Sequence, residues 1–249
     1  MNDSCVMAND LSKHFLVLRQ RETAFRMIKS FIRRESLMRK LSVLSHVSFE
    51  IKRGERVAVI GKNGAGKTTL MRLLAGIYKP SGGEIHAPVD PKVLLNFWTG
   101  FSLDLSVVDN VYLCGTIFGG ERMVLSRHVH RILEMAELSS VSHSPVKRLS
   151  LGQIQRLSLS IFLNTPGDFL IFDECLAFVD KGFLQKSDGF INGHITDDKT
   201  VIMASHDGDF LKKHCTRAIW LDEGRIRMDG EAHRVISEYE RAVFEQAAV

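Results

Sequence analysis

The sequence predicts an α/β domain whose core is a mainly parallel sheet. Short apolar runs at residues 169–172, 201–204 and 218–221 are separated by helical segments, and this alternation is typical of such sheets. A glycine-rich loop also lies between a buried strand and a helix near residue 60. The chain has 249 residues, 45% of them hydrophobic, which is enough for one such domain with a substantial core.

The individual elements follow from hydrophobic periodicity. Alternating apolar residues predict a half-buried strand, an unbroken apolar run predicts a buried strand, and apolar residues three or four apart predict a helix. The expected elements are strands at 45–51, 56–60, 169–172, 201–204 and 218–221, helices at 68–77, 208–214 and 235–248, a turn at 79–83, and helices between 107 and 143 that Gly119 and Gly120 interrupt.

The composition excludes several classes of protein. Charged residues make up 25% of the chain, a value that does not signal disorder. No apolar run approaches the roughly 20 residues needed to span a bilayer. Residues 1–5 lack the basic and then apolar order of a secretory signal, and the four cysteines are too scattered to hold a metal ion. We therefore expect a cytosolic protein with free thiols.

The net charge of +4 is unevenly distributed along the chain. Residues 18–41 contain eight basic and two acidic side chains, so this segment carries +6 and the other residues together carry −2. Its apolar and basic residues are spaced like the two faces of a basic amphipathic helix. A solvated helix packed on its own domain is the alternative. The apolar face comprises Ala24, Met27, Ile28, Phe31 and Met38, and the basic residues off it are Arg26, Lys29, Arg33 and Arg34.

Residues 61–68, Gly-Lys-Asn-Gly-Ala-Gly-Lys-Thr, match the pattern G-x-x-x-x-G-K-[ST]. The glycines allow backbone N–H groups to surround phosphate oxygens, Lys67 adds a positive charge, and the Thr68 hydroxyl can bind Mg²⁺. The alternative is a glycine-rich turn that happens to contain a lysine, but a position between a buried strand and a helix favours a nucleotide phosphate site. The residues expected there are Gly61, Asn63, Gly64, Ala65, Gly66, Lys67, Thr68 and Thr69.

Two carboxylates follow the strand expected at 169–172. Asp173 can hold Mg²⁺, while Glu174 beside it points elsewhere and can act as a general base. An Asp-Glu pair after four apolar residues is a weak signal by itself, and the phosphate-binding loop makes it a strong one.

These residues resemble the ATP-binding cassette (ABC) family of P-loop ATPases. Residues 149–153, Leu-Ser-Leu-Gly-Gln, look like the family's LSGGQ signature with Leu151 in place of the first glycine. The resemblance implies that Ser150, Gly152 and Gln153 open a helix and contact the γ-phosphate of ATP held by a second copy. It therefore implies a homodimer with two shared ATP sites. A serine-capped helix with no ligand is the alternative.

Two further segments extend the resemblance, which covers residues 11 to about 239. Residues 204–207 look like the family's switch segment, so His206 would bind the γ-phosphate and orient Glu174 and the attacking water. Residues 177–180 look like the D-loop, so Asp180 would lie at the dimer interface.

The start of the chain adds the last nucleotide contact. Residues 12–15 are similar to the start of these domains, so Phe15 is expected to stack on adenine, although a lone Phe is more often a core residue. The resemblance implies one ABC ATPase domain over residues 1–249, with a mainly parallel core, an antiparallel β subdomain and a helical subdomain at about 98–160.

One loop departs from the family pattern. ABC proteins usually present a Gln to Mg²⁺ and water from the loop between the two halves of the domain, but residues 101–106 contain no Gln. Ser102 is the nearest equivalent there. It would reach the metal ion through a water molecule, or the loop would serve mainly to contact a transmembrane partner.

Softer motifs suggest which ABC proteins are most similar. Residues 105–111 and 224–230 look like the ATPase subunits of bacterial polysaccharide exporters for O-antigen, capsule and teichoic acid, and the basic insertion at 18–41 is similar too. The resemblance implies an integral membrane permease partner and a peripheral position on the cytoplasmic side of the inner membrane. The basic segment would then meet anionic lipid or the diphosphate of a lipid-linked glycan.

Two other functions stay open. The first is the ATPase subunit of a drug or lipid exporter. The second is a soluble ABC ATPase that works on nucleic acid or ribosomes, whose basic segment would contact phosphates. No nucleic acid partner is expected, because such proteins commonly carry two cassettes or a long coiled-coil insertion. Only about ten residues follow Tyr239, so no C-terminal carbohydrate-binding domain is expected.

Overall fold

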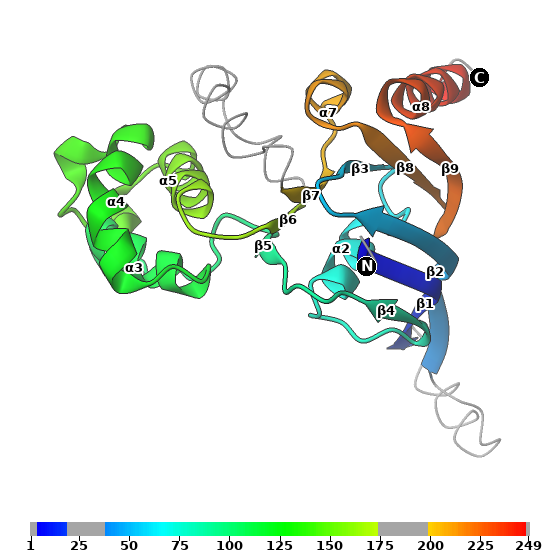
Figure 1. Ribbon diagram of the computed structural model, residues 1–249, viewed down its shortest axis with the longest axis horizontal. Helices are drawn as coiled ribbons and strands as arrows, with labels where there is room; N and C mark the ends of the chain where they lie inside the picture. Colours follow the sequence, from blue (N-terminus) through cyan, green and yellow to red (C-terminus); the bar gives the residue numbers. More distant parts are fainter. Residues whose placement is uncertain (1–3, 19–37, 174–198, 248–249) are drawn as a thin grey trace, which may run out of the picture.

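The computed structural model describes residues 4–18, 38–173 and 199–247, and its centre is a six-stranded sheet (Figure 1). The strand order is β5-β6-β7-β3-β8-β9, and every neighbouring pair is parallel except the antiparallel pair β8 and β9. The predicted fold class is therefore confirmed. The strands are β3 (Arg56–Ile60), β5 (Lys92–Leu94), β6 (Phe169–Asp173), β7 (Thr200–Ala204), β8 (Arg217–Asp222) and β9 (Arg225–Glu231).

Both faces of this sheet are covered, which explains why its central strands are apolar throughout. Val57 and Val59 of β3 pack toward α2 (Lys67–Leu74), and Ala58 and Ile60 belong to the cluster that includes residues of α7 and α8. Figure 1 shows α7 (Gly208–His214) and α8 (Ala232–Ala247) on one side of the sheet and α2 on the other. Successive side chains of β3 thus still alternate between the two faces of the sheet, although neither face is exposed to water.

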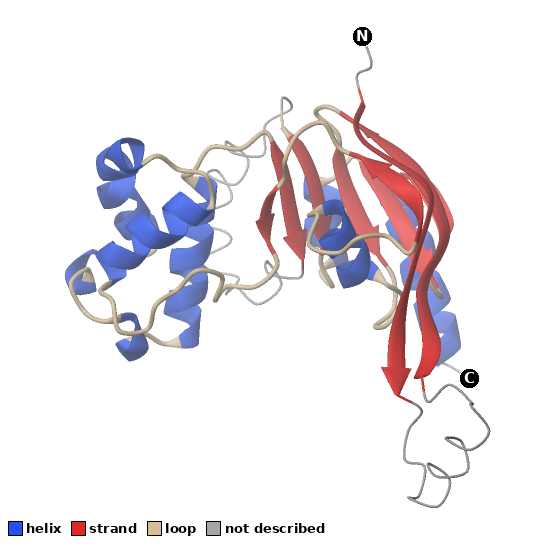
Figure 2. Ribbon diagram, turned by 90° about the horizontal axis from the view of Figure 1, so that it is seen from below, coloured by secondary structure: helices blue, strands red, loops and turns tan. Residues whose placement is uncertain are grey.

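A second, antiparallel sheet lies beyond α2. It has the order β2-β1-β4, with β1 (Ser4–Leu18), β2 (Met38–Lys52) and β4 (Gly82–His86). Figure 2 shows the paired ends of β1 and β2 extending away from the rest of the molecule. The sequence had not predicted β1, and β2 is longer than the strand expected at 45–51.

The end of β2 corrects part of the amphipathic-helix prediction. Met38 was placed on the apolar face of a helix, but residues 38–41 form a strand in which Phe15 pairs with Leu41 and Leu18 with Met38. Pairing with β1 satisfies the backbone hydrogen-bonding groups of these residues. Periodicity within a short stretch of sequence cannot reveal a strand partner that lies twenty or more positions away. Residues 19–37, with the rest of that prediction, lie outside the described residues.

The helical subdomain stands apart from both sheets at the β5 edge (Figure 1). Gly119, in a left-handed conformation with φ of 85°, lies between its first two helices, as the sequence predicts. The longest described helix, α8, has 16 residues, and no helix in the described ranges is long and apolar enough to cross a bilayer. The subdomain comprises α3 (Val107–Ile117), α4 (Arg122–Met135), α5 (Leu151–Leu163) and 3₁₀ turns at Ser139–Val141 and Val146–Arg148.

Helix α2 ends three residues earlier than the sequence predicts. The chain reverses at Gly76, which has a φ of 69°, and the Ile77 N–H then donates to the Arg72 carbonyl at 2.9 Å. A glycine in this conformation is a common helix stop. The turn expected at 79–83 is also shorter, because β4 begins at Gly82.

Candidate nucleotide-binding site

The glycine-rich loop joins β3 directly to α2 and is packed so closely that two positions require glycine. A Cβ atom on Gly61 would lie 2.3 Å from the Leu221 carbonyl oxygen. A Cβ atom on Gly66, whose φ is 106°, would lie 2.7 Å from a methyl group of Leu44. The loop therefore has the tight turn that phosphate-binding loops need before a helix N-terminus.

Lys67 closes this loop from within. Its side chain is buried, and its Nζ donates to the Gly61 carbonyl at 2.8 Å and to the Lys62 carbonyl at 3.4 Å. The ammonium group therefore lies against the backbone that would surround a phosphate. The structure brings every predicted residue of this motif into the loop and the first turn of α2, namely Gly61, Asn63, Gly64, Ala65, Gly66, Lys67, Thr68 and Thr69.

Strand register brings the other polar groups to the same edge of the sheet. Met203 of β7 pairs with Ala58 of β3 on one side and with Phe172 of β6 on the other. All three strands are parallel, so the loop after β3, the end of β6 and the segment after β7 leave the sheet side by side. This is where ligands bind in open α/β sheets.

Asp173 is the last residue of β6 and is only 6% exposed. A carboxylate buried at this edge and the Thr68 hydroxyl at the start of α2 would both offer oxygen donors, which Mg²⁺ prefers. The residues present therefore fit the predicted metal ion. Glu174 and Asp180 lie outside the described residues.

His206 lies two residues after β7 and is exposed. The turn that carries it is fixed on both sides. The Ser205 hydroxyl accepts a hydrogen bond from the Asp207 N–H at 3.1 Å, and the Asp207 carboxylate accepts one from the Phe210 N–H at 3.0 Å, capping α7. The backbone around His206 is thus held at the edge where Asp173 ends its strand.

Asn96 is a polar residue at this edge that the sequence reasoning missed. Leu94 of β5 pairs with Phe172 of β6, so the chain two residues later leaves the sheet beside the end of β6. The Asn96 Oδ1 accepts hydrogen bonds from the Trp98 N–H at 3.0 Å and the Thr99 hydroxyl at 3.1 Å. The sequence does carry a signal for this residue, since Asn96 directly follows the apolar run Val93-Leu94-Leu95.

Ser102 lies farther along the same connection, where the chain approaches the helical subdomain. Its N–H donates to the Asn110 side chain at 2.8 Å, and the Asn110 amide donates back to the Ser102 carbonyl at 2.9 Å. Asn110 is fully buried and also donates to the carbonyls of Leu105 and Ser106. This part of the loop is therefore fixed to the start of α3.

The signature-like element forms the N-terminus of α5. The Ser150 hydroxyl accepts from the Gln153 N–H at 3.3 Å, and the Gln153 side chain accepts from the Ser150 N–H at 2.9 Å, which is a capping box. Ser150 and Gly152 are exposed. Figure 1 shows α5 within the helical subdomain and α2 beneath the sheet, so the chain keeps this element apart from its own phosphate loop.

Phe15 lies on β1 and packs against another ring. Its centroid is 5.5 Å from that of Tyr78 in an edge-to-face arrangement, and the Lys13 Nζ lies 5.1 Å from the Phe15 ring. Phe15 is half-buried, so the structure makes it part of a small surface cluster rather than of the main core.

Comparison with known proteins confirms the resemblance. The ABC transporter family model matches residues 44–177. The O-antigen export system ATP-binding protein RfbB of Klebsiella pneumoniae is 34% identical over 205 residues, which cover 82% of this chain and 83% of that protein. The teichoic acids export ATP-binding protein TagH of Bacillus cereus is 34% identical over 196 residues, covering 79% of this chain and 36% of that protein.

Solved structures agree on the fold. The ATP-binding subunit of an ABC transporter superposes with a TM-score of 0.72 at 19% identity and covers 95% of this chain and 93% of its own. A dimeric ATP-binding cassette bound to ADP and Pi gives a TM-score of 0.71 at 19% identity, covering 91% of this chain and 98% of its own. The phosphate loop, the sheet edge and the family match together identify a nucleotide-binding ATPase domain, and the chain belongs to the ABC transporter family.

Proposed function

We propose that the chain is the ATP-hydrolysing subunit of an exporter that moves a lipid-linked polysaccharide, of the O-antigen, capsule or teichoic acid type, across a membrane. The observation that carries the proposal is the 34% identity to a protein named for O-antigen export, over 83% of its length. A relative named for teichoic acid export supports the same class of substrate. A separate integral membrane permease carries the glycan.

ATP binds at the carboxyl edge of the six-stranded sheet. Backbone N–H groups of the loop from Gly61 to Gly66 and the Lys67 ammonium hold the phosphates, and Phe15 stacks on the adenine. Thr68 and Asp173 hold Mg²⁺, which neutralises charge on the phosphates when bound. The oxygen donors at this edge support that assignment.

Hydrolysis needs a base and a group that orients the water. Glu174 accepts the proton of the attacking water, and His206 binds the γ-phosphate and orients Glu174. The fixed turn around His206 supports this role, because it restricts where the imidazole can reach.

Two copies close around ATP. Ser150, Gly152 and Gln153 of one copy contact the γ-phosphate held by the other, and Asp180 lies at their interface. The separation of α5 from α2 within one chain supports this arrangement (Figure 1). The capping box leaves donors for the γ-phosphate. The N–H groups of Leu151 and Gly152 take no part in it and lie in the first turn of an exposed helix N-terminus.

The loop after β5 serves mainly the permease. Ser102 reaches the metal ion only through water, and its backbone is fixed by Asn110. Large apolar side chains are exposed on this loop and on α3, and such side chains mark contact surfaces. They are Trp98, Leu103, Leu105, Leu113 and Ile117.

The basic segment at 18–41 lies at the cytoplasmic membrane surface. There it binds phosphate groups, either those of lipid headgroups or the diphosphate of the lipid-linked glycan. Its described end supports this placement, because Arg39 and Lys40 are exposed beside Met38 and Leu16, which are 50% and 62% exposed. Each cation near anionic lipid contributes on the order of 1 kcal/mol. The chain is then a peripheral subunit on the cytoplasmic side of the inner membrane.

Charge reversal tests the membrane contact of this segment. Replacing Arg26, Lys29, Arg33 and Arg34 by Glu should reduce export of the glycan by about tenfold or more, because four favourable lipid contacts become unfavourable. The ATPase rate of the isolated full chain should stay unchanged. The control is Lys52→Glu with Arg53→Glu, which reverses exposed charges near the other end of β2.

Purification of the full chain from membranes provides the second readout. An integral membrane protein should co-purify with it, and identification of that protein separates a glycan exporter from a drug or lipid exporter. Unchanged export in the reversed variant would contradict the membrane contact of residues 18–41. Co-purification with nucleic acid in place of a membrane protein would contradict the exporter function.

A further inference from the structure

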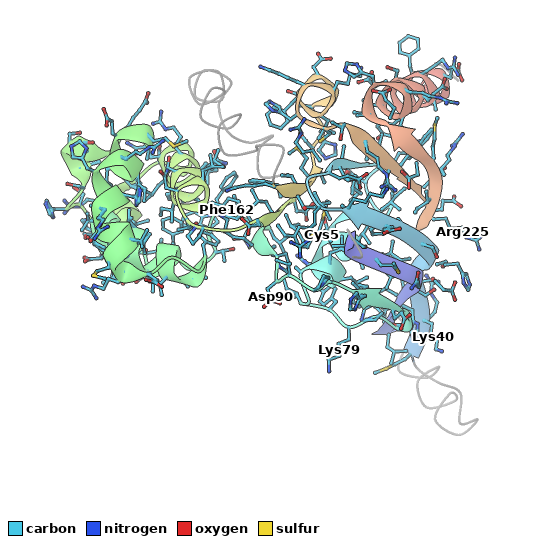
Figure 3. The ribbon with its side chains drawn as sticks, in the orientation of Figure 1. Cys5, Lys40, Lys79, Asp90, Phe162 and Arg225 are labelled. Carbon is cyan, nitrogen blue, oxygen red and sulfur yellow. The ribbon has the colours of Figure 1, made fainter. Side chains whose placement is uncertain are left out.

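Lys92 connects the sheet to the helical subdomain. It is the first residue of β5, the edge strand of the six-stranded sheet, and its side chain is only 9% exposed. Its Nζ donates to the carbonyls of Phe162 and Thr165, each at 2.7 Å. Figure 3 labels Phe162 at the junction between the helices and the sheet. A buried amino group thus joins two parts of the molecule.

One of the carbonyls that Lys92 binds, that of Phe162, is in the last turn of α5, and the other, that of Thr165, lies two residues beyond the helix. The last carbonyls of a helix have no partner within the helix, and they lie at the negative end of its dipole. A lysine can satisfy both requirements. Here the lysine comes from a strand 70 residues away in sequence from Phe162, so the cap also fixes α5 to the sheet.

Apolar contacts also hold the junction. The Phe162 ring packs edge-to-face on Phe118, which caps the C-terminus of α3, and on Phe172 of β6, with centroids 5.3 Å and 4.9 Å away. Hydrogen bonds add a sharper restraint to such packing, because they weaken steeply when they bend. The two short bonds from Lys92 therefore add a directional constraint on α5 to its packing against α3, α4 and the sheet.

We propose that Lys92 is a positioning residue for ATP hydrolysis: it holds α5 at the angle at which Ser150 meets the ATP bound by the second copy. This inference rests on the shared ATP site proposed above. A helix of 13 residues is about 20 Å long, so a rotation of about 3° at its C-terminal end moves its N-terminus by about 1 Å. Displacements of this size can lower a reaction rate by about 10²-fold.

The contact does not depend on the charge of Lys92. Burial lowers the pKa of its amino group to about 7, assisted by Lys199 and opposed by Asp168. A neutral amine still has two N–H donors for the two carbonyls. The orientation of α5 is therefore kept on both sides of neutral pH.

Mixed dimers test the proposal, because α5 of one copy serves the ATP site of the other. A trace of wild-type full chain is mixed with an excess of a carrier, a full chain bearing Lys67→Ala, so that nearly every wild-type chain pairs with a carrier. Hydrolysis then occurs at the phosphate loop of the wild-type chain, which faces α5 of the carrier. A carrier that also bears Lys92→Met should support about tenfold less ATPase activity. Lys92→Arg in the carrier should restore at least half of it.

Controls separate positioning from loss of stability. A carrier with Lys67→Ala and Leu125→Ala is destabilised within the helical subdomain but keeps Lys92, and it should support full activity below its melting temperature. A trace of Lys92→Met chain with the Lys67→Ala carrier should also keep the wild-type rate, because the carrier supplies an intact α5.

The outcomes distinguish this inference from the proposed function. A carrier with Lys67→Ala and Ser150→Ala must lower the rate if the ATP sites are shared. If it does not, the proposed arrangement fails and the role of Lys92 fails with it. If the Ser150 carrier lowers the rate and the Lys92→Met carrier does not, the inference about Lys92 alone is overturned.

Discussion

The edge of the sheet and the start of α5 hold their functional residues in contrasting ways. At the edge, the loop after β3, Asp173 and the turn around His206 follow strands that pair in register and are buried on both faces. At the start of α5, Ser150 is exposed and lies a helix length away from the junction with the sheet. The groups proposed for the chemical step are thus on a rigid support, and the group proposed to meet a second copy lies at the far end of a helix.

The helices of the subdomain nevertheless pack closely on one another, in a buried cluster that continues onto the sheet. Leu125, Val111 and Ile132 are essentially fully buried, and residues of α3, α4 and α5 pack together. The difference between the regions therefore lies in the attachment of the subdomain, through Phe162 and Lys92, and not in its internal packing. Changes inside the subdomain should leave nucleotide binding at the sheet edge intact.

Leu125→Ala should give the largest effect on stability. Leu125 is 1% exposed and packs closely against Gly115 and Gly120, so its truncation should lower the free energy of unfolding of the helical subdomain by about 2–5 kcal/mol. Urea unfolding with and without ATP measures this, and ATP affinity should be unchanged in low urea. The matched control is Leu16→Ala, at a side chain that is 62% exposed, which should change stability by about 0.5 kcal/mol or less.

Loss of ATP binding in the Leu125→Ala chain before its helices unfold would contradict the separation of the two regions. Binding would then depend on packing within the helical subdomain. The sheet edge and the helical subdomain would then behave as a single cooperative unit.

A smaller effect should come from the pH dependence of stability at Lys92. Burial lowers the pKa of its amino group from 10.5 to about 7 in the folded chain. Between these pH values the unfolded chain binds a proton that the folded chain has lost, so the free energy of unfolding rises as pH increases. Wild type should gain on the order of 1–3 kcal/mol relative to Lys92→Met between pH 7 and about 10.

Urea midpoints of both chains, measured across this pH range, give that difference directly. The comparison with Lys92→Met cancels the titration of all other groups. Parallel curves for the two chains would show that the Lys92 amino group is not buried at the junction.

The sheet edge could be predicted from sequence because its signals are local. The strand at 56–60 and the helix at 208–214 have the predicted bounds, and α7 begins where the Asp207 side chain caps it. The glycine pattern of the phosphate loop also depends on neighbours in sequence. Each of these features is decided within about ten residues.

The features that could not be predicted depend on distant partners. Alternation in β1 is broken by register shifts, and Asp10 and His46, both with positive φ, form a 2.7 Å pair across them. β9 alternates exposed and half-buried residues, so its strand character depends on pairing with β8. Lys92 looks like an ordinary strand residue until α5 is folded against it.

The most direct test of the central claim is the ATPase rate of the full chain carrying Glu174→Gln. If Glu174 is the base at this sheet edge, hydrolysis should slow by about 10²–10⁴-fold, because the amide cannot accept the proton of the attacking water. ATP and Mg²⁺ should still convert the variant into a stable dimer in size-exclusion chromatography. Turnover near the wild-type rate, or a chain that stays monomeric with ATP, would contradict the account.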